Sequence, residues 1–385
     1  MCDTVESIHG KKLNKGEWAE FYVMLKLLGE GKIYAADELL RKNYKSYLDI
    51  LKVIRQETSR VLDYVIDTKK GIVAVTDQET GKVLEEVSQK EFRKQSDILF
   101  DGMSKVSGKS IEAPVSVCDF ARVIYVTKPK APAVKALKKQ FGGKNDIFIQ
   151  VRDPGTSLVS VMGFSIKSKH SQNPTLFNAG SSSQFLFCVN GCDDEKADRF
   201  NAIEDKGNRG WSKCKDYLKE TGMTLEFIDT KNPVYHDNLV LIRESMPDIL
   251  GWCVKDRLVD ADGHYEVMET VERLAKANPL GVSSPDVFYE KVMKDFLMAG
   301  FTGMTAGKVW DGKEQVNGGY IVVMADGDVL CFHSVDRERF RDYLYRNTHF
   351  EYVSTGKYVW GYIEKTEDGY VLPLNMSVRF NTRTR

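Results

Sequence analysis

The chain has 385 residues, too many for one compact core, and this length indicates two or three folding units. Hydrophobic residues make up 42% of it and charged residues 29%, an ordinary soluble composition, and no apolar run is long enough to span a bilayer as a helix. The 55 basic residues balance the 55 acidic ones, so the chain lacks the overall positive charge that is common in nucleic-acid-binding proteins. An acidic N-terminus without an apolar stretch, together with an odd number of scattered cysteines, indicates a cytoplasmic protein with reduced thiols.

The N-terminal third alternates between helical and strand patterns. Apolar periodicity predicts a helix over residues 15–29, ended by glycines, and a second helix over 44–65. Residues 32–36 fit either a short strand or an extension into the next helix. Apolar stretches on both sides of a Glu-Thr-Gly-Lys turn predict a hairpin over 71–88, and a polar helix followed by a loop is expected over 89–112.

The central part begins with strands and then becomes helical. Apolar and β-branched residues predict a strand over 121–127, and a β-hairpin is expected over 146–168. Another strand is expected at 184–190. The polar stretch 192–215 fits a loop or a helix, and 226–300 is expected to be mainly helical.

The last 85 residues are expected to be strand-rich around one helix. The expected strands cover 319–324, 329–333, 357–364 and 369–380, and the helix lies near 336–346. These patterns suggest a core at 1–190 with an inserted helical and hairpin segment at about 40–115, a mainly helical segment at 191–300, and a β-rich segment at 301–385.

The hairpin at 146–168 carries the most informative residues. Alternation places Asp146 and Gln150 on one face of its first strand, and the Asp-Pro-Gly-Thr sequence at 153–156 supplies the turn. Folding the chain about this turn brings Asp146 opposite Ser165, with Lys167 nearby on the same face. A carboxylate and an ammonium placed in this way can hold a divalent metal and steer a water molecule. That chemistry suits phosphodiester hydrolysis.

The first helix offers a carboxylate in an apolar setting. Glu20 falls between Met24 and Leu27 by helical rotation, and Glu17 lies on the same side of the helix. A carboxylate on an apolar face is costly unless it is paired. A metal ion is one partner, and a buried arginine or lysine is the ordinary structural one.

Lysines cluster just before Asp146. Such a run forms either a solvated face or a surface that contacts phosphate, and beside a candidate metal site both interpretations stay open. The run comprises Lys128, Lys130, Lys135, Lys138, Lys139 and Lys144.

Taken together, these segments resemble the PD-(D/E)xK nuclease superfamily. The sequence from Lys15 to Glu20 is similar to its Lys-Gly-x-x-x-Glu helix start, Asp146 to the acid before its apolar strand, and Lys167 to its lysine. Ser165 stands where an acid is usual, which removes one oxygen ligand that Gln150, Glu20 or Glu17 could replace. The resemblance implies an α/β (α+β mixed) fold. Its nuclease core would have a mixed central sheet flanked by helices, with additional helical and β-rich recognition segments.

A narrower likeness follows from the residues after the hairpin turn. Gly-Phe-Ser-Ile-Lys-Ser at 163–168, followed by Pro-Thr-Leu-Phe-Asn-Ala at 174–179, resembles the HpaII family of type II restriction endonucleases, whose serine variant accounts for Ser165. Segments near both termini, 14–23 and 374–380, are similar as well. The resemblance implies Mg²⁺-dependent cleavage of double-stranded DNA at a short palindrome, with CCGG expected from the namesake. It also implies a homodimer on DNA, a bacterial or archaeal cytoplasm, and a DNA methyltransferase as functional partner.

The resemblance assigns roles to individual residues. Asp146, Glu20 and the backbone carbonyl of Ile166 would bind one or two Mg²⁺ ions, with Mn²⁺ as a substitute and Glu17 as the weaker alternative ligand. Lys167 would orient the attacking water or offset negative charge in the transition state, and Ser165 and Gln150 complete the candidate catalytic set. The candidate DNA-contacting residues are Lys144, Lys169, His170, Gln172, Asn178, Ser181 and Ser182.

Two other functions stay open at this point. One is a non-catalytic DNA-binding protein with a degenerate nuclease core, which Ser165 and the zero net charge favour slightly. The other is a nuclease of the same fold that reads DNA structure rather than sequence. Nucleases of that kind are usually much shorter than this chain.

Overall fold

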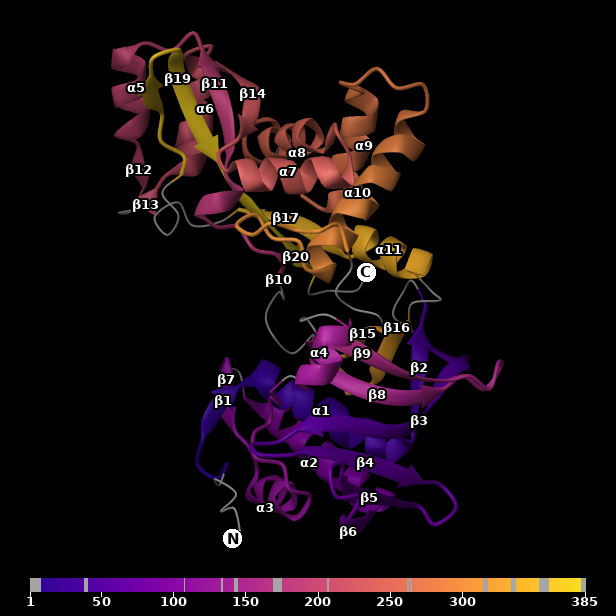
Figure 1. The fold of residues 1–385 in the computed structure, drawn as a ribbon. Coiled ribbons are helices and arrows are strands. Elements are labelled where there is room, and N and C mark those ends of the chain that lie inside the picture. The colour runs from indigo at the N-terminus through magenta and orange to yellow at the C-terminus, as the bar shows by residue number, and fades with distance from the viewer. Residues whose placement is uncertain are drawn as a thin grey trace. The chain divides into compact units, whose positions relative to one another are not determined.

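The structure is a computed structural model of the whole chain, and it divides into two compact units (Figure 1). Unit 1 comprises residues 1–174 and 315–340, and unit 2 comprises 175–314 and 341–385. The chain therefore passes from one unit to the other after residues 174, 314 and 340. The residues described are 8–37, 41–106, 108–132, 134–141, 145–168, 175–205, 208–261, 263, 265–313, 318–333, 337–352 and 360–381. Within these ranges, no helix has the length and apolar character needed to cross a membrane.

Unit 1 combines helices with a large sheet. Its helices are α1 (Lys15–Glu30), α2 (Gln89–Lys105), α3 (Val115–Val123) and α4 (Lys135–Phe141). Its strands are β1 (Lys12–Asn14), β2 (Lys32–Ala36), β3 (Lys42–Gln56), β4 (Val61–Asp67), β5 (Ile72–Asp77), β6 (Val83–Ser88), β7 (Ser110–Glu112), β8 (Ile147–Arg152), β9 (Val159–Ser168), β15 (Gly319–Val323) and β16 (Val329–His333).

Nine of these strands form one mixed sheet in the order β2-β16-β15-β9-β8-β3-β4-β5-β6, while β1 pairs with β7. The pairs β9–β15 and β16–β2 are parallel, and the other pairs in this order are antiparallel. The late strands β15 and β16 thus pair with β9 and β2, which are distant from them in sequence. In Figure 1 the orange β16 lies beside the indigo β2. A mixed central sheet flanked by helices agrees with the fold class expected from the sequence.

Helix α1 is the central element of the unit 1 core. It packs against α2 and against β2, β3 and β9, so most of its residues are buried, among them Trp18 and Phe21. Asn14 and Glu17 form a capping box at its start, and Gly31, with φ of 71°, ends it in the left-handed conformation. The helix predicted over 15–29 is confirmed. The hairpin at 71–88 and the helix after residue 89 are confirmed as β5–β6 and α2.

The helix predicted over 44–65 is wrong, because these residues form most of β3 and β4. The register of β3 against β8 shifts between Ile50 and Lys52, which marks a bulge. The bulge changes which side chains face the core, so the buried Leu48 and Ile50 are followed by the buried Val53 and Ile54. The resulting spacing of three or four residues imitates a helical period.

The strand predicted over 121–127 is also wrong. Helix α3 occupies 115–123, and its buried residues Val117, Phe120 and Ala121 follow helical spacing. Phe120 packs edge-on against Phe92 of α2, with ring centroids 5.1 Å apart. Tyr125, with φ of 60°, then turns the chain. Packing on α2 therefore overrides the strand propensity of the apolar run.

Unit 2 also mixes helices and strands. Its helices are α5 (Asp194–Asn201), α6 (Trp211–Glu220), α7 (Pro233–Ile242), α8 (Met246–Lys255), α9 (Val267–Ala277) and α10 (Pro285–Thr302), with a short 3₁₀ turn at Ser181–Ser183 and a π-helical turn at Asp256–Asp260. Helix α11 (Arg337–Arg346) crosses the boundary at residue 340. Its strands are β10 (Thr175–Phe177), β11 (Phe185–Asn190), β12 (Glu204–Asp205), β13 (Asn208–Arg209), β14 (Thr224–Thr230), β17 (Thr348–Tyr352), β18 (Glu364–Thr366), β19 (Gly369–Leu374) and β20 (Met376–Phe380).

The strands of unit 2 form separate small sheets, with the orders β14-β11-β19-β18 and β10-β20-β17, and a β12-β13 pair. The mainly helical character expected for 226–300 is confirmed by α7 to α10, and the polar stretch 192–215 contains α5 and the first half of α6. The strand expected at 357–364 differs, because β18 begins only at Glu364 and residues 353–359 lie outside the described ranges.

Candidate active site

The β8–β9 hairpin positions the first acid of the candidate site. The register pairs Ile147 with Phe164, so Asp146, just before β8, lies across from Ser165. The Asp146 N–H donates to the Phe164 carbonyl at 2.8 Å. Its Oδ2 accepts hydrogen bonds from the Ser165 hydroxyl at 3.0 Å and from the Ile166 N–H at 2.8 Å. These bonds fix the carboxylate and leave Oδ1 directed elsewhere.

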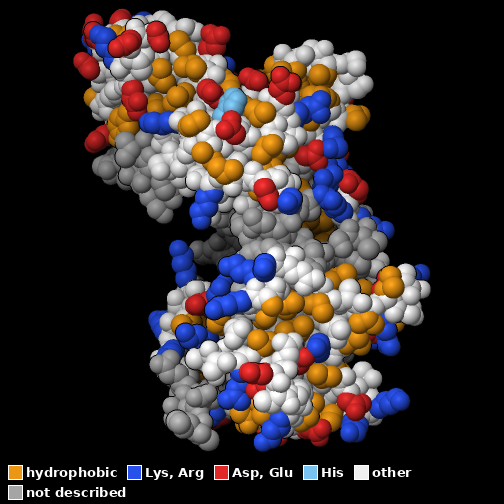
Figure 2. Space-filling model, in the orientation of Figure 1, with side chains coloured by type: hydrophobic (Ala, Val, Ile, Leu, Met, Phe, Trp, Pro, Cys, Tyr) orange, Lys and Arg blue, Asp and Glu red, His pale blue; other side chains and the backbone are white. Residues whose placement is uncertain are grey.

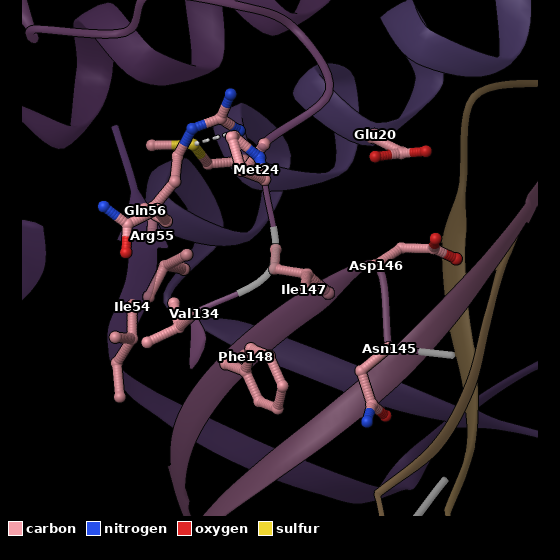
Figure 3. Close-up of a pocket in the computed structure, with 13 residues that line it drawn as sticks. Glu20, Met24, Ile54, Arg55, Gln56, Val134, Asn145, Asp146, Ile147 and Phe148 are labelled. Atoms are coloured by element: carbon pink, nitrogen blue, oxygen red, sulfur yellow. Dashed lines mark hydrogen bonds between the residues drawn. The ribbon is translucent and has the colours of Figure 1, made fainter. Parts of the chain in front are cut away.

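The second acid comes from α1. Glu20 is 9% exposed, and its Oε1 accepts a hydrogen bond from the Lys130 ammonium at 2.8 Å. The same ammonium lies 3.8 Å from Oδ1 of Asp146, so a single lysine bridges the two carboxylates. Figure 3 shows Glu20 and Asp146 on one side of a pocket that has Ile54 and Arg55 on its other side.

The pocket lies between α1, β3, β8 and the segment before α4. The residues that line it are Glu20, Met24, Val53, Ile54, Arg55, Gln56, Ala131, Pro132, Val134, Asn145, Asp146, Ile147 and Phe148. Most of these side chains are apolar, so they make the surroundings of the two acids poorly hydrated. Such surroundings strengthen every electrostatic interaction within them.

The electrostatics of the site follow from this burial. Burial raises the pKa of the Glu20 carboxyl to about 7, and the charge of Asp146 acts in the same direction, while the hydrogen bond from Lys130 opposes both. Burial works against protonation of Lys130, but the hydrogen bond and charge of Glu20 and the charge of Asp146 outweigh it and raise the pKa of Lys130. Lys130 is therefore favoured in its charged form beside the two acids.

Lys167 lies on β9, two residues beyond Ser165, and is half-buried. Burial lowers the pKa of its ammonium, although the charges of Asp146 and Glu20 act to raise it. A lowered pKa makes an ammonium a better proton donor and its neutral amine easier to form. Lys167 directly follows Ile166, whose N–H donates to Asp146, so β9 carries the lysine beside the acid at the start of β8.

The other predicted residues make contacts that differ from their predicted roles. Glu17 takes part in the capping box, where its carboxylate accepts from the Asn14 N–H at 3.2 Å. Gln150 lies further along β8, opposite Val161, and is not among the residues that line the pocket. The Ile166 N–H, rather than its carbonyl, is the group seen in contact with Asp146.

The predicted DNA-contacting residues divide into two groups. Lys144, Lys169, His170 and Gln172 lie outside the described ranges. Asn178, Ser181 and Ser182 belong to unit 2, between β10 and β11, where Asn178 and Ser181 are exposed and Ser182 is half-buried.

Sequence reasoning did not single out Lys130, although the lysine run contained it. Three other lysines of that run, Lys135, Lys138 and Lys139, are exposed on α4, and Figure 2 shows Lys and Arg side chains gathered over that helix. Nothing in the sequence distinguishes the lysine that pairs with both acids from those that face solvent, because the fold alone brings residue 130 back to α1.

The donor set suits a hard divalent cation. Oε2 of Glu20 is buried and has no hydrogen-bond partner among the described residues, which is rare for a carboxylate oxygen unless a ligand takes it up. The described ranges contain no group of three or more His, Cys, Asp or Glu residues arranged for a metal. Two carboxylates with water for the remaining positions match the preference of Mg²⁺, which usually keeps several waters.

Comparison with known proteins identifies the family. The model of the HpaII restriction endonuclease family matches residues 14–380, nearly the whole chain. The type II restriction enzyme HpaII of Haemophilus parainfluenzae is 29% identical over 369 residues, which cover 95% of this chain and 98% of that enzyme. No solved structure gives a significant match. The chain therefore belongs to the HpaII restriction endonuclease family, and its enzyme class is that of a type II site-specific deoxyribonuclease.

Proposed function

We propose that this enzyme cleaves double-stranded DNA at the palindrome CCGG, that it depends on Mg²⁺, and that Glu20, Asp146 and Lys167 form its catalytic site. The observation that carries the proposal is the proximity of two carboxylates on α1 and at the start of β8, with a half-buried lysine on β9 under the influence of both. This is an arrangement suited to a metal-assisted phosphodiester hydrolysis.

Glu20 and Asp146 would hold the ion, with the Ile166 carbonyl as a further oxygen donor. A bound Mg²⁺ would supply an activated water and neutralise charge at the scissile phosphate, and Mn²⁺ would be a suitable substitute. The site would take one or two such ions. The hydrogen bonds from Ser165 and the Ile166 N–H keep Asp146 oriented toward the site.

Lys167 would place a positive charge beside the scissile phosphate. Its ammonium would stabilise the extra negative charge of the transition state and orient the attacking water. The burial that lowers its pKa also shields the interaction from solvent, so the charge acts at greater strength than it would on the surface. Gln150 and Glu17 remain candidates for weaker, supporting roles.

Base recognition is assigned to residues outside this site. Asn178 and Ser181, exposed in unit 2, carry donors and acceptors suited to base edges, and Ser182, Lys144, Lys169, His170 and Gln172 complete the proposed DNA-contacting set. The exposed lysines of α4 suit phosphate contacts, which set affinity but not sequence.

A palindromic target suits a two-fold symmetric protein, so we propose a homodimer on DNA. Each subunit would cut one strand. A DNA methyltransferase that modifies the same site would be the functional partner in the cell, protecting host DNA without physical association.

The test uses two linear duplexes that differ at one site. The first contains a single CCGG, and the second carries CAGG in its place; each is incubated with the enzyme and Mg²⁺, and the ends are mapped. Cutting of the first duplex alone at CCGG is the expected result. Discrete cutting at another sequence would leave the restriction activity standing and overturn the proposed target.

Two further outcomes would replace the proposal. Binding of duplex DNA without cutting, in both Mg²⁺ and Mn²⁺, would favour a degenerate nuclease core, as Ser165 first suggested. Cutting confined to branched DNA would favour a nuclease that reads structure. Both alternatives are distinguished by adding a four-way junction and a plain duplex to the same assay.

A further inference from the structure

Lys130 occupies an unusual position for a surface lysine. Its side chain is 53% exposed, yet its ammonium reaches the 10% exposed side chain of Glu20 at 2.8 Å and lies 3.8 Å from Asp146. One positive charge therefore sits between the two carboxylates that face the pocket. An ammonium in this position serves the same electrostatic purpose as a metal ion, since it offsets two negative charges held close together.

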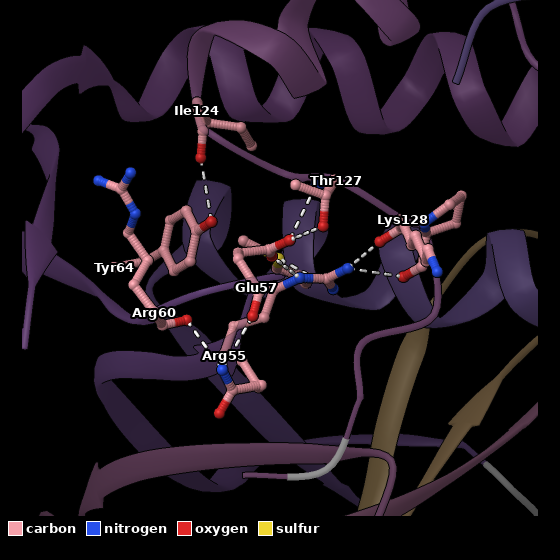
Figure 4. Close-up of polar contacts among 10 residues, drawn as sticks. Arg55, Glu57, Arg60, Tyr64, Ile124, Thr127 and Lys128 are labelled. Atoms are coloured by element: carbon pink, nitrogen blue, oxygen red, sulfur yellow. Dashed lines mark hydrogen bonds and ion pairs between the residues drawn. The ribbon is translucent and has the colours of Figure 1, made fainter. Parts of the chain in front are cut away.

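A buried ion pair holds the segment before Lys130 in place through hydrogen bonds. Arg55 and Glu57 are 6% and 3% exposed, and the Arg55 Nε donates to Glu57 Oε1 at 2.6 Å. Glu57 Oε2 accepts from both the N–H of Thr127, at 2.8 Å, and its hydroxyl, at 2.6 Å. Figure 4 shows Glu57 directed toward Thr127 and the Arg55 guanidinium directed toward Lys128.

Arg55 completes the attachment. Its Nη2 donates to the carbonyl of Lys128 and, at 3.0 Å, to the carbonyl of Pro129, the residue immediately before Lys130. A little earlier in the chain, the Tyr64 hydroxyl donates to the Ile124 carbonyl at 3.0 Å. A buried ion pair is costly unless its remaining hydrogen-bonding capacity is used, and here the loop backbone uses it. The backbone that carries Lys130 is therefore anchored on both sides of Thr127.

The side chain of Lys130 can move although its backbone is anchored. Half of it is open to solvent, so its ammonium can leave the carboxylates by rotation of its own side chain. A metal ion that binds Glu20 and Asp146 would occupy the position that the ammonium now holds, and it would offset the same two negative charges. The anchored backbone would keep Lys130 close by after it has left.

We propose that Lys130 is the resident counter-cation of the metal-free site, that a divalent metal must displace its ammonium from Glu20 and Asp146, and that the Arg55–Glu57 pair holds the loop in the position for this contact. The inference rests on the proposed function in taking these two acids as the metal-binding pair. Lys130 is thus a positioning residue that sets the metal affinity of the site.

The test measures binding of Mn²⁺ to the DNA-free, full-length protein by titration calorimetry. Lys130→Gln removes the competing charge and should bind Mn²⁺ roughly fivefold more tightly than the parent, the effect expected for a partly exposed ion pair. Lys130→Arg keeps the charge and should stay within twofold of the parent. Lys135→Gln removes an exposed charge of α4, from the same lysine run, that has no such contact with the acids among the ion pairs of the described residues, and it should also stay within twofold.

A second variant leaves the charges untouched. Thr127→Val deletes the hydroxyl that donates to Glu57, which loosens the loop while the Thr127 N–H contact remains available. Tighter Mn²⁺ binding by roughly twofold is expected, and a general change in charge cannot produce it. Labelling of lysines with an acetylating reagent adds a direct readout, because Mn²⁺ should increase the labelling of Lys130 but not of Lys135.

The outcomes distinguish the role of Lys130 from the metal site itself. Unchanged or weaker Mn²⁺ binding by Lys130→Gln, with binding abolished in Glu20→Gln and Asp146→Asn, would overturn the role of Lys130 and leave the proposed site standing. Equal gains in Lys130→Gln and Lys135→Gln would reduce the effect to long-range charge and also overturn it. Mn²⁺ binding that persists unchanged in Glu20→Gln and Asp146→Asn would overturn the metal site itself.

Discussion

The buried carboxyl of Glu20 gives the metal-free protein a specific dependence on pH. Its pKa is raised from the ordinary 4.5 to about 7, chiefly by burial. Between these values the unfolded chain has lost the Glu20 proton while the folded chain keeps it, so stability falls as the pH rises through this range. The loss begins near pH 4.5 and is complete above pH 7. Glu20→Gln replaces the carboxyl by a neutral group of the same shape and removes the dependence.

The size of the effect follows from the same two values. One pKa step corresponds to about 1.4 kcal/mol, so the rise of Glu20 corresponds to about 3 kcal/mol in all, of which about 2.5 kcal/mol falls between pH 5 and pH 8. The free energy of unfolding of Glu20→Gln, relative to the parent, should therefore increase by roughly this amount over that interval.

Amide hydrogen exchange of peptides from α1, in the presence of a chelator, measures this difference. Comparing variant and parent at the same pH cancels the intrinsic exchange rates, and reading α1 alone avoids the separate unfolding of unit 2. Glu86→Gln, on the exposed side of β6, controls for the removal of one negative charge. If the free energy of unfolding of Glu20→Gln differs from that of the parent by the same amount at pH 5 and at pH 8, the proposed pH dependence of Glu20 is refuted.

Three further changes probe the surroundings of the site. Glu57→Ala should destabilise unit 1 by about 3 to 5 kcal/mol, measured by hydrogen exchange of β3, because it leaves its buried arginine partner uncompensated. Gly163→Ala would place a Cβ 2.5 Å from Oδ1 of Asn145, so it should cost about 1 to 3 kcal/mol of stability in the same assay, and an unchanged exchange rate would show that Asn145 can move aside freely. Ser165→Ala removes the 3.0 Å hydrogen bond to Asp146 and should weaken Mn²⁺ binding in a calorimetric titration by roughly three- to tenfold, whereas an unchanged affinity would mean that the Ile166 N–H alone orients the carboxylate.

Local sequence patterns predicted those elements in which the local conformational preference and the tertiary packing favour the same structure. Helix α1 has a capping box, an apolar surface and a terminal glycine, and the β8–β9 hairpin has alternation on both sides of an Asp-Pro-Gly turn. In both cases the local preference and the packing favour the same conformation. The boundaries of such elements could therefore be predicted within a residue or two.

The wrong predictions arose where packing and local preference disagree. The bulge in β3 near residue 51 gave strand residues a helical spacing, and the contact of α3 with α2 made a helix of an apolar run. No single-chain pattern shows that 319–333 pairs with β9 and β2, because parallel pairing between distant segments depends on the whole fold. The role of Lys130 was missed for the same reason, since its partners lie 110 and 16 positions away.

The most direct test of the site is single-turnover cleavage of a CCGG duplex by Lys167→Ala, with DNA affinity measured on the same protein. The account predicts cleavage slower by about 100- to 1,000-fold, the usual loss for a charge that stabilises a transition state, with DNA affinity within threefold of the parent. Lys82→Ala, exposed at the β5–β6 turn, should cleave at the parental rate. Cleavage by Lys167→Ala within a few-fold of the parent would contradict the assignment of the β8–β9 hairpin as the catalytic element.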